Sequence, residues 1–225
     1  MTSVNFKKRL TIMKILLIAF LCISCLYAKA QTTTATDVFK QMPENMLPYL
    51  TENNKLDMID FVNANMKSEV TNRFGGNTQM LKLDSTYLKI QLNPAVMLEL
   101  KLLKPSAQLK DSAEWVVCML TTYGVKSRES KVEFYSSKWN KLDIPSPITG
   151  IDFKEFLSRP DTMNIEKYNE IINNPEEYIY SASLSSTDES MTINASTTIL
   201  MKEQNDILKP LFVTKRLQWD GKTFK

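Results

Sequence analysis

The side chains in this sequence that could carry out catalysis include two pairs of carboxylates. Asp57 and Asp60 lie three residues apart, so on a helix they would be neighbours on one side. Glu176 and Glu177 are adjacent, and adjacent residues of a strand point to opposite faces. A glycoside hydrolase uses two carboxylates as its acid and its base or nucleophile. We interpret Asp57 and Asp60 as a solvated helix flank, and a carboxylate-dependent hydrolase of envelope or dietary glycans is the alternative function.

Cys118 is the remaining candidate nucleophile. It lies between Val117 and Met119 in an apolar run. No basic residue next to it in the sequence would lower its pKa, as a reactive thiolate requires. We expect Cys118 to be a buried structural thiol on a doubly covered strand.

The residue types that are absent exclude most other chemistry. The chain has no histidine, so it has no Ser-His or Cys-His nucleophile and lacks the usual zinc ligands. Its 5 glycines are scattered and form no phosphate-binding loop. The acidic residues do not follow EF-hand spacing. We therefore predict no catalytic residues, no metal ion and no cofactor, and we expect that the protein is not an enzyme.

Residues 1–30 have the pattern of a secretory signal. Basic residues precede an apolar stretch from Ile15 to Tyr27, and Ala28-Lys29-Ala30 fits a cleavage site with small residues. The stretch is shorter than the roughly 20 residues that span a bilayer. We expect cleavage after Ala30, a periplasmic or extracellular location, and no membrane span in the mature chain.

Two alternatives concern the start and the processing of the chain. Ser24-Cys25 resembles the end of a lipid-attachment box, although Cys22 stands where leucine is expected. A lipoprotein attached through Cys25 is therefore the alternative to a free N-terminus. Translation could start at Met1 or at Met13, because Met13-Lys14 begins a compact signal by itself.

Removal of the signal changes the charge of the chain. The signal contains five of the 28 basic residues and none of the 25 acidic ones, so the formal net charge changes from +3 to about −2. Nucleic-acid binding needs clustered basic residues, and we expect no nucleic-acid partner. Cys118 is the single cysteine left, so the fold is held by burial without an internal disulfide.

The stretch from Leu81 to Leu142 predicts four antiparallel strands. Apolar and polar residues alternate from Thr86 to Leu92 and again from Val96 to Leu102, with Asn93-Pro94 as the turn. Trp115 to Thr121 is apolar on both faces, and Lys131 to Tyr135 alternates again. We expect these runs to form the main sheet.

The surrounding sequence completes a predicted α+β fold, with helices packed on antiparallel sheet. We expect a signal in 1–30, a tether and loop in 31–50, a helix plus a four-stranded unit in 51–142, a Pro-rich hinge in 143–150, and a second helix-plus-strand unit in 151–225. The first helix should run from Glu52 to about Glu69, with a core face that comprises Leu56, Ile59, Val62 and Met66.

The two halves also end alike, which suggests a loose tandem repeat. Trp139 is followed by Asn140 and Trp219 by Asp220, at the predicted end of a strand in each half. A repeat predicts that Trp219 packs against its own helix, on Phe156, Ile165, Tyr168 and Ile171. The alternative is a single α+β domain whose second half extends the sheet.

Several short motifs carry a resemblance to a known family. They are the Ala-Gln end of the signal, Met42-Pro43, Leu47-Pro48-Tyr49-Leu50, Leu56-Asp57-Met58-Ile59-Asp60, Tyr87-Leu88, Leu120-Thr121-Thr122, and Val132-Glu133-Phe134-Tyr135 with Trp139. In these motifs the chain resembles an uncharacterised domain-of-unknown-function family of secreted Bacteroidales proteins. The resemblance covers most of the mature chain. It implies secretion and transfers no catalytic residue.

The function we expect is that of a non-catalytic envelope protein, a binding or assembly module for a protein or glycan partner. Exposed aromatic side chains would contact such a partner. The candidates are Tyr123, Tyr135, Trp139, Trp219 and Phe224. The oligomeric state does not follow from the sequence.

Three Asp-Ser/Thr-x triplets resemble the O-glycosylation sequon of secreted Bacteroidales proteins. The candidate acceptors are Ser85, Ser112 and Thr162. We expect each of them in a loop or at the edge of a strand.

Overall fold

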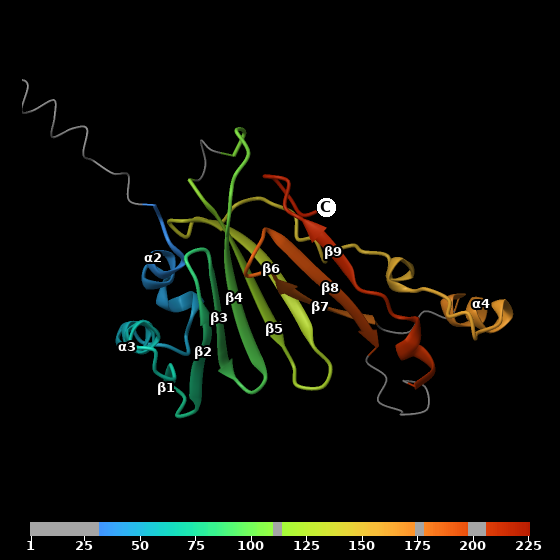
Figure 1. Cartoon of the computed structure of the whole chain (residues 1–225), viewed down its shortest axis with the longest axis horizontal. Helices are drawn as coiled ribbons and strands as arrows, with labels where there is room; N and C mark the ends of the chain where they lie inside the picture. Colours follow the sequence, from blue (N-terminus) through green and yellow to red (C-terminus); the bar gives the residue numbers. More distant parts are fainter. Residues whose placement is uncertain (1–31, 110–113, 174–177, 198–205) are drawn as a thin grey trace, which may run out of the picture. The chain divides into compact units, whose positions relative to one another are not determined.

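Six antiparallel strands in sequence order form the main sheet of the computed structural model, which describes residues 32–109, 114–173, 178–197 and 206–225. The strands are β1 (Glu69–Thr71), β2 (Asn77–Leu83), β3 (Tyr87–Asn93), β4 (Val96–Leu103), β5 (Val116–Tyr123) and β6 (Glu129–Ser136). Figure 1 shows them as one continuous meander. The four predicted strands are therefore confirmed as β3 to β6.

The sheet has two more strands than the sequence pattern predicted, and the helix before it is shorter. Helix α3 (Glu52–Asn63) ends well before the expected Glu69. Asn65 adopts a left-handed φ of 54°, which an asparagine tolerates at the end of a helix. The chain turns there and enters β1 and β2, which the sequence reading had missed.

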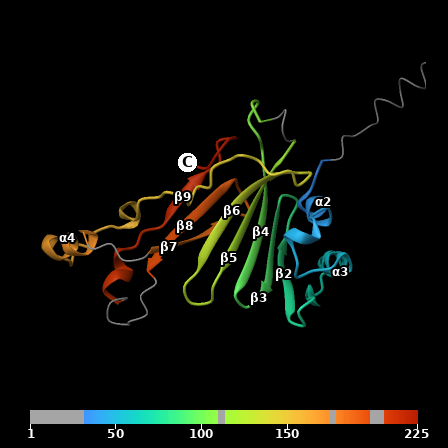
Figure 2. The same ribbon diagram turned by 180° about the vertical axis from the view of Figure 1, so that it is seen from behind.

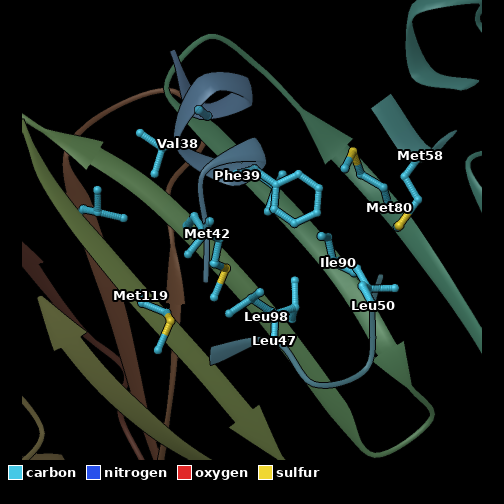
Figure 3. Close-up of a cluster of buried hydrophobic side chains, with 14 of the residues drawn as sticks. Val38, Phe39, Met42, Leu47, Leu50, Met58, Met80, Ile90, Leu98 and Met119 are labelled. Carbon is cyan, nitrogen blue, oxygen red and sulfur yellow. The ribbon is translucent and has the colours of Figure 1, made fainter. Parts of the chain in front are cut away.

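One face of this sheet is covered by α2 (Ala35–Lys40), the 3-10 turn η1 (Glu44–Met46) and α3. Thr34 and Thr51 each form a capping box with the residue three positions later, which fixes where α2 and α3 begin. Buried side chains from α2 and the loop after it lie on the sheet next to Met80, Ile90 and Leu98 (Figure 3). The predicted tether and loop at 31–50 is thus mostly part of the core, which corrects that expectation.

The buried face of α3 also differs from the predicted one. Met58 and Ile59 are buried, whereas Leu56 is 44% exposed and Met66, beyond the helix, is 59% exposed. Lys55 is buried in place of Leu56, and its Nζ donates hydrogen bonds to the backbone oxygens of Lys40 and Met42. Its long aliphatic stem packs in the core while these oxygens accept its N–H groups, and Nζ also pairs with the Glu52 carboxylate at 2.7 Å.

A second sheet of three strands lies against the other face of the main sheet. It has the order β7 (Tyr178–Leu184), β8 (Ser190–Thr197), β9 (Lys215–Gln218). Figures 1 and 2 show α2 and α3 on one side of the main sheet and β7 to β9 on the other. A shared core that includes Phe134, Leu184 and Met191 fills the space between the sheets. The predicted α+β class with antiparallel sheets is confirmed.

The two halves are not equivalent, so the expected tandem repeat is wrong. Trp219 stacks on Phe134 of the main sheet, with ring centroids 5.8 Å apart. Tyr168 and Ile171 of α4 (Ile165–Asn173) belong instead to a separate small cluster, and α4 lies far from the main sheet in Figures 1 and 2. Residues Thr33–Lys225 form one compact unit, as the single-domain alternative requires, but the second half forms a separate sheet and does not extend the main one as that alternative expected. Among the described helices, none is long and apolar enough to cross a bilayer.

Candidate functional site

A cavity of about 360 Å³ opens on the helix-bearing face of the main sheet, at one end of β4, β5 and β6. In Figure 3 Met119 lies to one side of the other labelled side chains. The residues that line the cavity are Met46, Leu47, Pro48, Tyr49, Leu92, Val96, Leu98, Met119, Thr121, Tyr123, Lys131, Glu133 and Tyr135.

Two neighbouring strands supply the polar half of this lining. Alternation along β5 places Met119, Thr121 and Tyr123 on the same face. On β6, Glu133 lies opposite Met119 and Lys131 lies opposite Thr121. The segment from η1 to Tyr49 forms the opposite wall, so the cavity has one irregular wall and a rigid floor.

Charged groups in and beside the cavity cluster around Glu133. Its two carboxylate oxygens contact Nζ of Lys131 at 2.9 Å and Nζ of Lys141 at 3.1 Å. Burial raises the pKa of Glu133, but the hydrogen bonds and charges of the two lysines outweigh it and keep this pKa below its usual value. The hydrogen bond to Glu133 raises the pKa of Lys131. Glu133 is therefore an anion at neutral pH, paired with two exposed lysines.

Tyrosines supply the aromatic surface of the cavity. Burial, followed by the charge of Glu133, raises the pKa of Tyr135, so its hydroxyl stays protonated at neutral pH. The hydroxyl of Tyr49 accepts a hydrogen bond of 2.9 Å from Nδ2 of Asn93. Its ring meets the exposed Phe74 edge to face, with centroids 5.2 Å apart. Rings held in this way offer apolar surface with polar groups beside it.

The structure separates the five predicted contact aromatics into two groups. Tyr123 is 48% exposed and lines the cavity, and Tyr135 lines it from a largely buried position. Trp139, Trp219 and Phe224 are buried in the cores, which corrects their interpretation as surface contacts. Their large rings pack in the cores. The indole nitrogens are also satisfied there, because Nε1 of Trp139 donates to the backbone oxygen of Val38 and Nε1 of Trp219 donates to that of Lys104.

The predicted catalytic alternatives do not meet in the cavity. Asp57 and Asp60 are exposed on α3 and are not among the lining residues. Glu176 and Glu177 lie outside the described residues. Cys118 is fully buried, and burial followed by the charge of Glu99 raises the pKa of its thiol. The predicted buried thiol is therefore confirmed.

A second polar cluster lies between the two sheets. The carboxylate of Glu99 is buried and accepts a hydrogen bond of 2.8 Å from the hydroxyl of Tyr87. It also accepts one of 3.0 Å from the backbone N–H of Leu184 and contacts Nζ of Lys89 at 3.1 Å. Leu184 belongs to β7, an edge strand of the second sheet. Glu99, on the face of the main sheet, therefore accepts a hydrogen bond from a backbone N–H at the edge of the second sheet. We interpret this cluster as a structural clamp.

The remaining predicted site residues are on the surface or not described. Ser85 is exposed in the bend between β2 and β3, and Thr162 is exposed in a turn before α4. Ser112 lies outside the described residues. In the described part of the chain, no group of three acidic or cysteine side chains is placed to hold a metal ion.

Comparisons with known proteins agree with this fold. The family model described as a protein of unknown function (DUF3256) matches residues 27–224. A solved domain of an uncharacterized protein from Porphyromonas gingivalis W83 superposes with a TM-score of 0.61 at 19% identity, covering 84% of this chain and 96% of that one. At this identity the likeness concerns the fold alone. A search of curated proteins gives no match.

Proposed function

We propose that this chain, which belongs to the DUF3256 family of proteins of unknown function, is a non-catalytic binding module. Its contact surface is the cavity over β5 and β6, and its partner is a protein or a glycan. The observation that carries this proposal is the lining of the cavity, where Tyr49, Tyr123 and Tyr135 lie beside the ion pair of Lys131 and Glu133.

The size and chemistry of the cavity suit a side chain or a sugar ring. Its volume of about 360 Å³ is at the lower end of the roughly 300–1,000 Å³ that ligand pockets occupy. Tyrosine rings bury large apolar area and keep a hydroxyl for hydrogen bonding, which is why they are enriched at interfaces. All the lining residues lie within the range that the family model matches.

The same geometry gives less support to the hydrolase alternative. Hydrolysis of a glycosidic bond by the usual route needs two carboxylates about 5 to 10 Å apart, one of them protonated. Among the residues that line the cavity, Glu133 is the single carboxylate. Its pKa is lowered by two lysines, which is the opposite of what a general acid requires.

We also propose that the protein is secreted across the inner membrane and functions in the periplasm or outside the cell. The support is the basic and apolar pattern of residues 1–30 and the Ala28-Lys29-Ala30 cleavage site. Mass spectrometry of the protein from its natural host should give a chain that begins at Gln31. A lipid-modified Cys25 at the N-terminus would support the lipoprotein alternative instead.

The binding proposal is tested by nuclear magnetic resonance of the purified protein with a panel of disaccharides and aromatic tripeptides. At least one compound should shift the backbone amide signals of Thr121, Tyr123 and Tyr135. Tyr123→Ala should abolish these shifts. Val125→Ala, which removes an even more exposed side chain that does not line the cavity, should preserve them.

The proposal fails if no compound in the panel shifts these signals. It also fails if Tyr123→Ala binds the active compound as tightly as the unchanged protein.

A further inference from the structure

Strand β6 is the end strand of the main sheet, and the bridge between Tyr135 and Lys141 occupies the C-terminal part of its outer backbone edge, which leaves the part from Glu129 to Glu133 open among the described strands. The described strands include no neighbour for it on the side away from β5. Phe134 accepts a hydrogen bond from the N–H of Leu142 there, and Ser136 donates one to Asn140. Backbone groups of a strand alternate in direction every residue, so the N–H and C=O of Val132 point to this same side. An edge of this kind is a template for another strand.

A groove of about 340 Å³ runs along this edge. It begins beyond the hydrogen bond between Leu142 and Phe134, and Val132 lies in its lining. The groove is separate from the cavity over β5 and β6, but Lys131 and Glu133 line both. A ligand in the groove would therefore lie next to the proposed binding surface.

The groove has two chemically different walls. Lys131, Glu133 and Lys141 lie on the face of β6 that carries the cavity. Leu142, Ile144 and Ile148 lie on the other face, where they are packed against the core between the sheets. Successive side chains of a strand point to opposite faces. The groove thus fits an extended segment whose side chains are alternately charged and apolar.

We propose that an extended segment of a partner protein adds to β6 as a further antiparallel strand. Its acidic side chains face Lys131 and Lys141, which outnumber Glu133, and its apolar side chains face Ile144 and Ile148. Backbone hydrogen bonds hold the segment, as in other cases of strand addition. This inference rests on the proposed binding function and assigns that function a protein partner.

The probe for the experiment is a capped hexapeptide of alternating glutamate and valine, titrated against the purified protein by calorimetry and amide hydrogen exchange. We expect binding with a Kd of about 1 mM or tighter, and slower exchange at the Val132 amide. A peptide of alternating lysine and valine should bind several-fold more weakly. No binding of the glutamate peptide at about 1 mM would overturn the inference.

Backbone methylation of the peptide tests strand pairing directly. In antiparallel pairing the residues opposite Val132 share its face, so the valine N–H groups point to β6. Methylation of the valine nitrogens should abolish binding, whereas methylation of the glutamate nitrogens should preserve it. Equal effects of the two modifications would overturn antiparallel strand addition.

Three protein variants complete the test. Lys141→Gln should weaken binding of the glutamate peptide several-fold, and Lys138→Gln, an exposed lysine outside the groove, should not. Val125→Ala should leave peptide binding unchanged, because the exposed Val125 lines neither the groove nor the cavity. If the glutamate peptide does not bind while a compound of the panel still binds in the cavity, strand addition is refuted and the proposed binding function stands. A dimer of the protein that excludes the peptide would show that a second copy fills the groove, and would also overturn it.

Discussion

Replacement of Glu99 by alanine should weaken the contact between the two sheets and lower the free energy of unfolding. The Glu99 carboxylate is 3% exposed and lies between the face of the main sheet and the edge of β7. Removing it leaves two buried donors without an acceptor, the hydroxyl of Tyr87 and the backbone N–H of Leu184. The third partner, Lys89, has a side chain that is 32% exposed and can turn to water.

The magnitude follows from the two orphaned donors. Each buried donor left without a partner costs about 1–3 kcal/mol, so Glu99→Ala should lower the free energy of unfolding by about 2–6 kcal/mol. That range includes the roughly 3–5 kcal/mol found when one partner of a buried ion pair is removed. Tyr87→Phe removes one donor and keeps the others paired, so it should cost about 1 kcal/mol.

Urea unfolding followed by tryptophan fluorescence measures these changes. Trp219 stacks across the sheets on Phe134, so its emission reports on the contact between them. Glu44→Ala is the matched control, because Glu44 pairs with Arg73 in solvent and an exposed pair is worth about 1 kcal/mol or less. A loss for Glu99→Ala no larger than that of the control would refute the structural clamp.

Three further outcomes are expected. A small thiol reagent should label Cys118 slowly in the folded protein and rapidly in denaturant, because burial raises the pKa of its thiol; fast labelling of the native state would contradict this. Glu133 has a folded pKa below its usual 4.5, so its ion pairs stabilise the fold above that pH and the contribution is lost as pH falls through the folded pKa. The stability difference between the unchanged protein and Glu133→Gln, measured by thermal unfolding, should therefore shrink in acid, and a constant difference would refute the assignment. Ile59→Ala should cost about 2–5 kcal/mol in urea unfolding and Leu56→Ala about 0.5 kcal/mol or less, whereas the sequence pattern alone predicts similar losses.

The strands of the main sheet could be predicted because their signals are local. Alternation in β3 and β4, the doubly apolar β5 and the turn at Asn93-Pro94 each lie within a few neighbouring residues. The three-residue strand β1 was missed because the apolar spacing around Met66 continues that of the helix up to its first residue. The left-handed Asn65 breaks the helix there.

The candidate site was partly predictable. Tyr123 and Tyr135 were expected as contact residues, and both line the cavity. Glu133 was missed because its importance comes from two lysines, and one of them, Lys141, approaches only after the chain turns back at the end of β6. The cavity itself depends on η1, whose position over the sheet has no signature in its own sequence.

The sequence by itself determined which residues of each strand share a face, and it excluded histidine-based and phosphate-loop chemistry. It could not determine what covers each face. Lys89, Glu99 and Lys101 alternate with apolar residues as an exposed polar face would, yet Glu99 and Lys101 are buried beneath β7. The alternation of a strand is set by its local backbone geometry. Which of its faces becomes buried depends on contacts with chain about 85 residues away, and only the tertiary structure decides these.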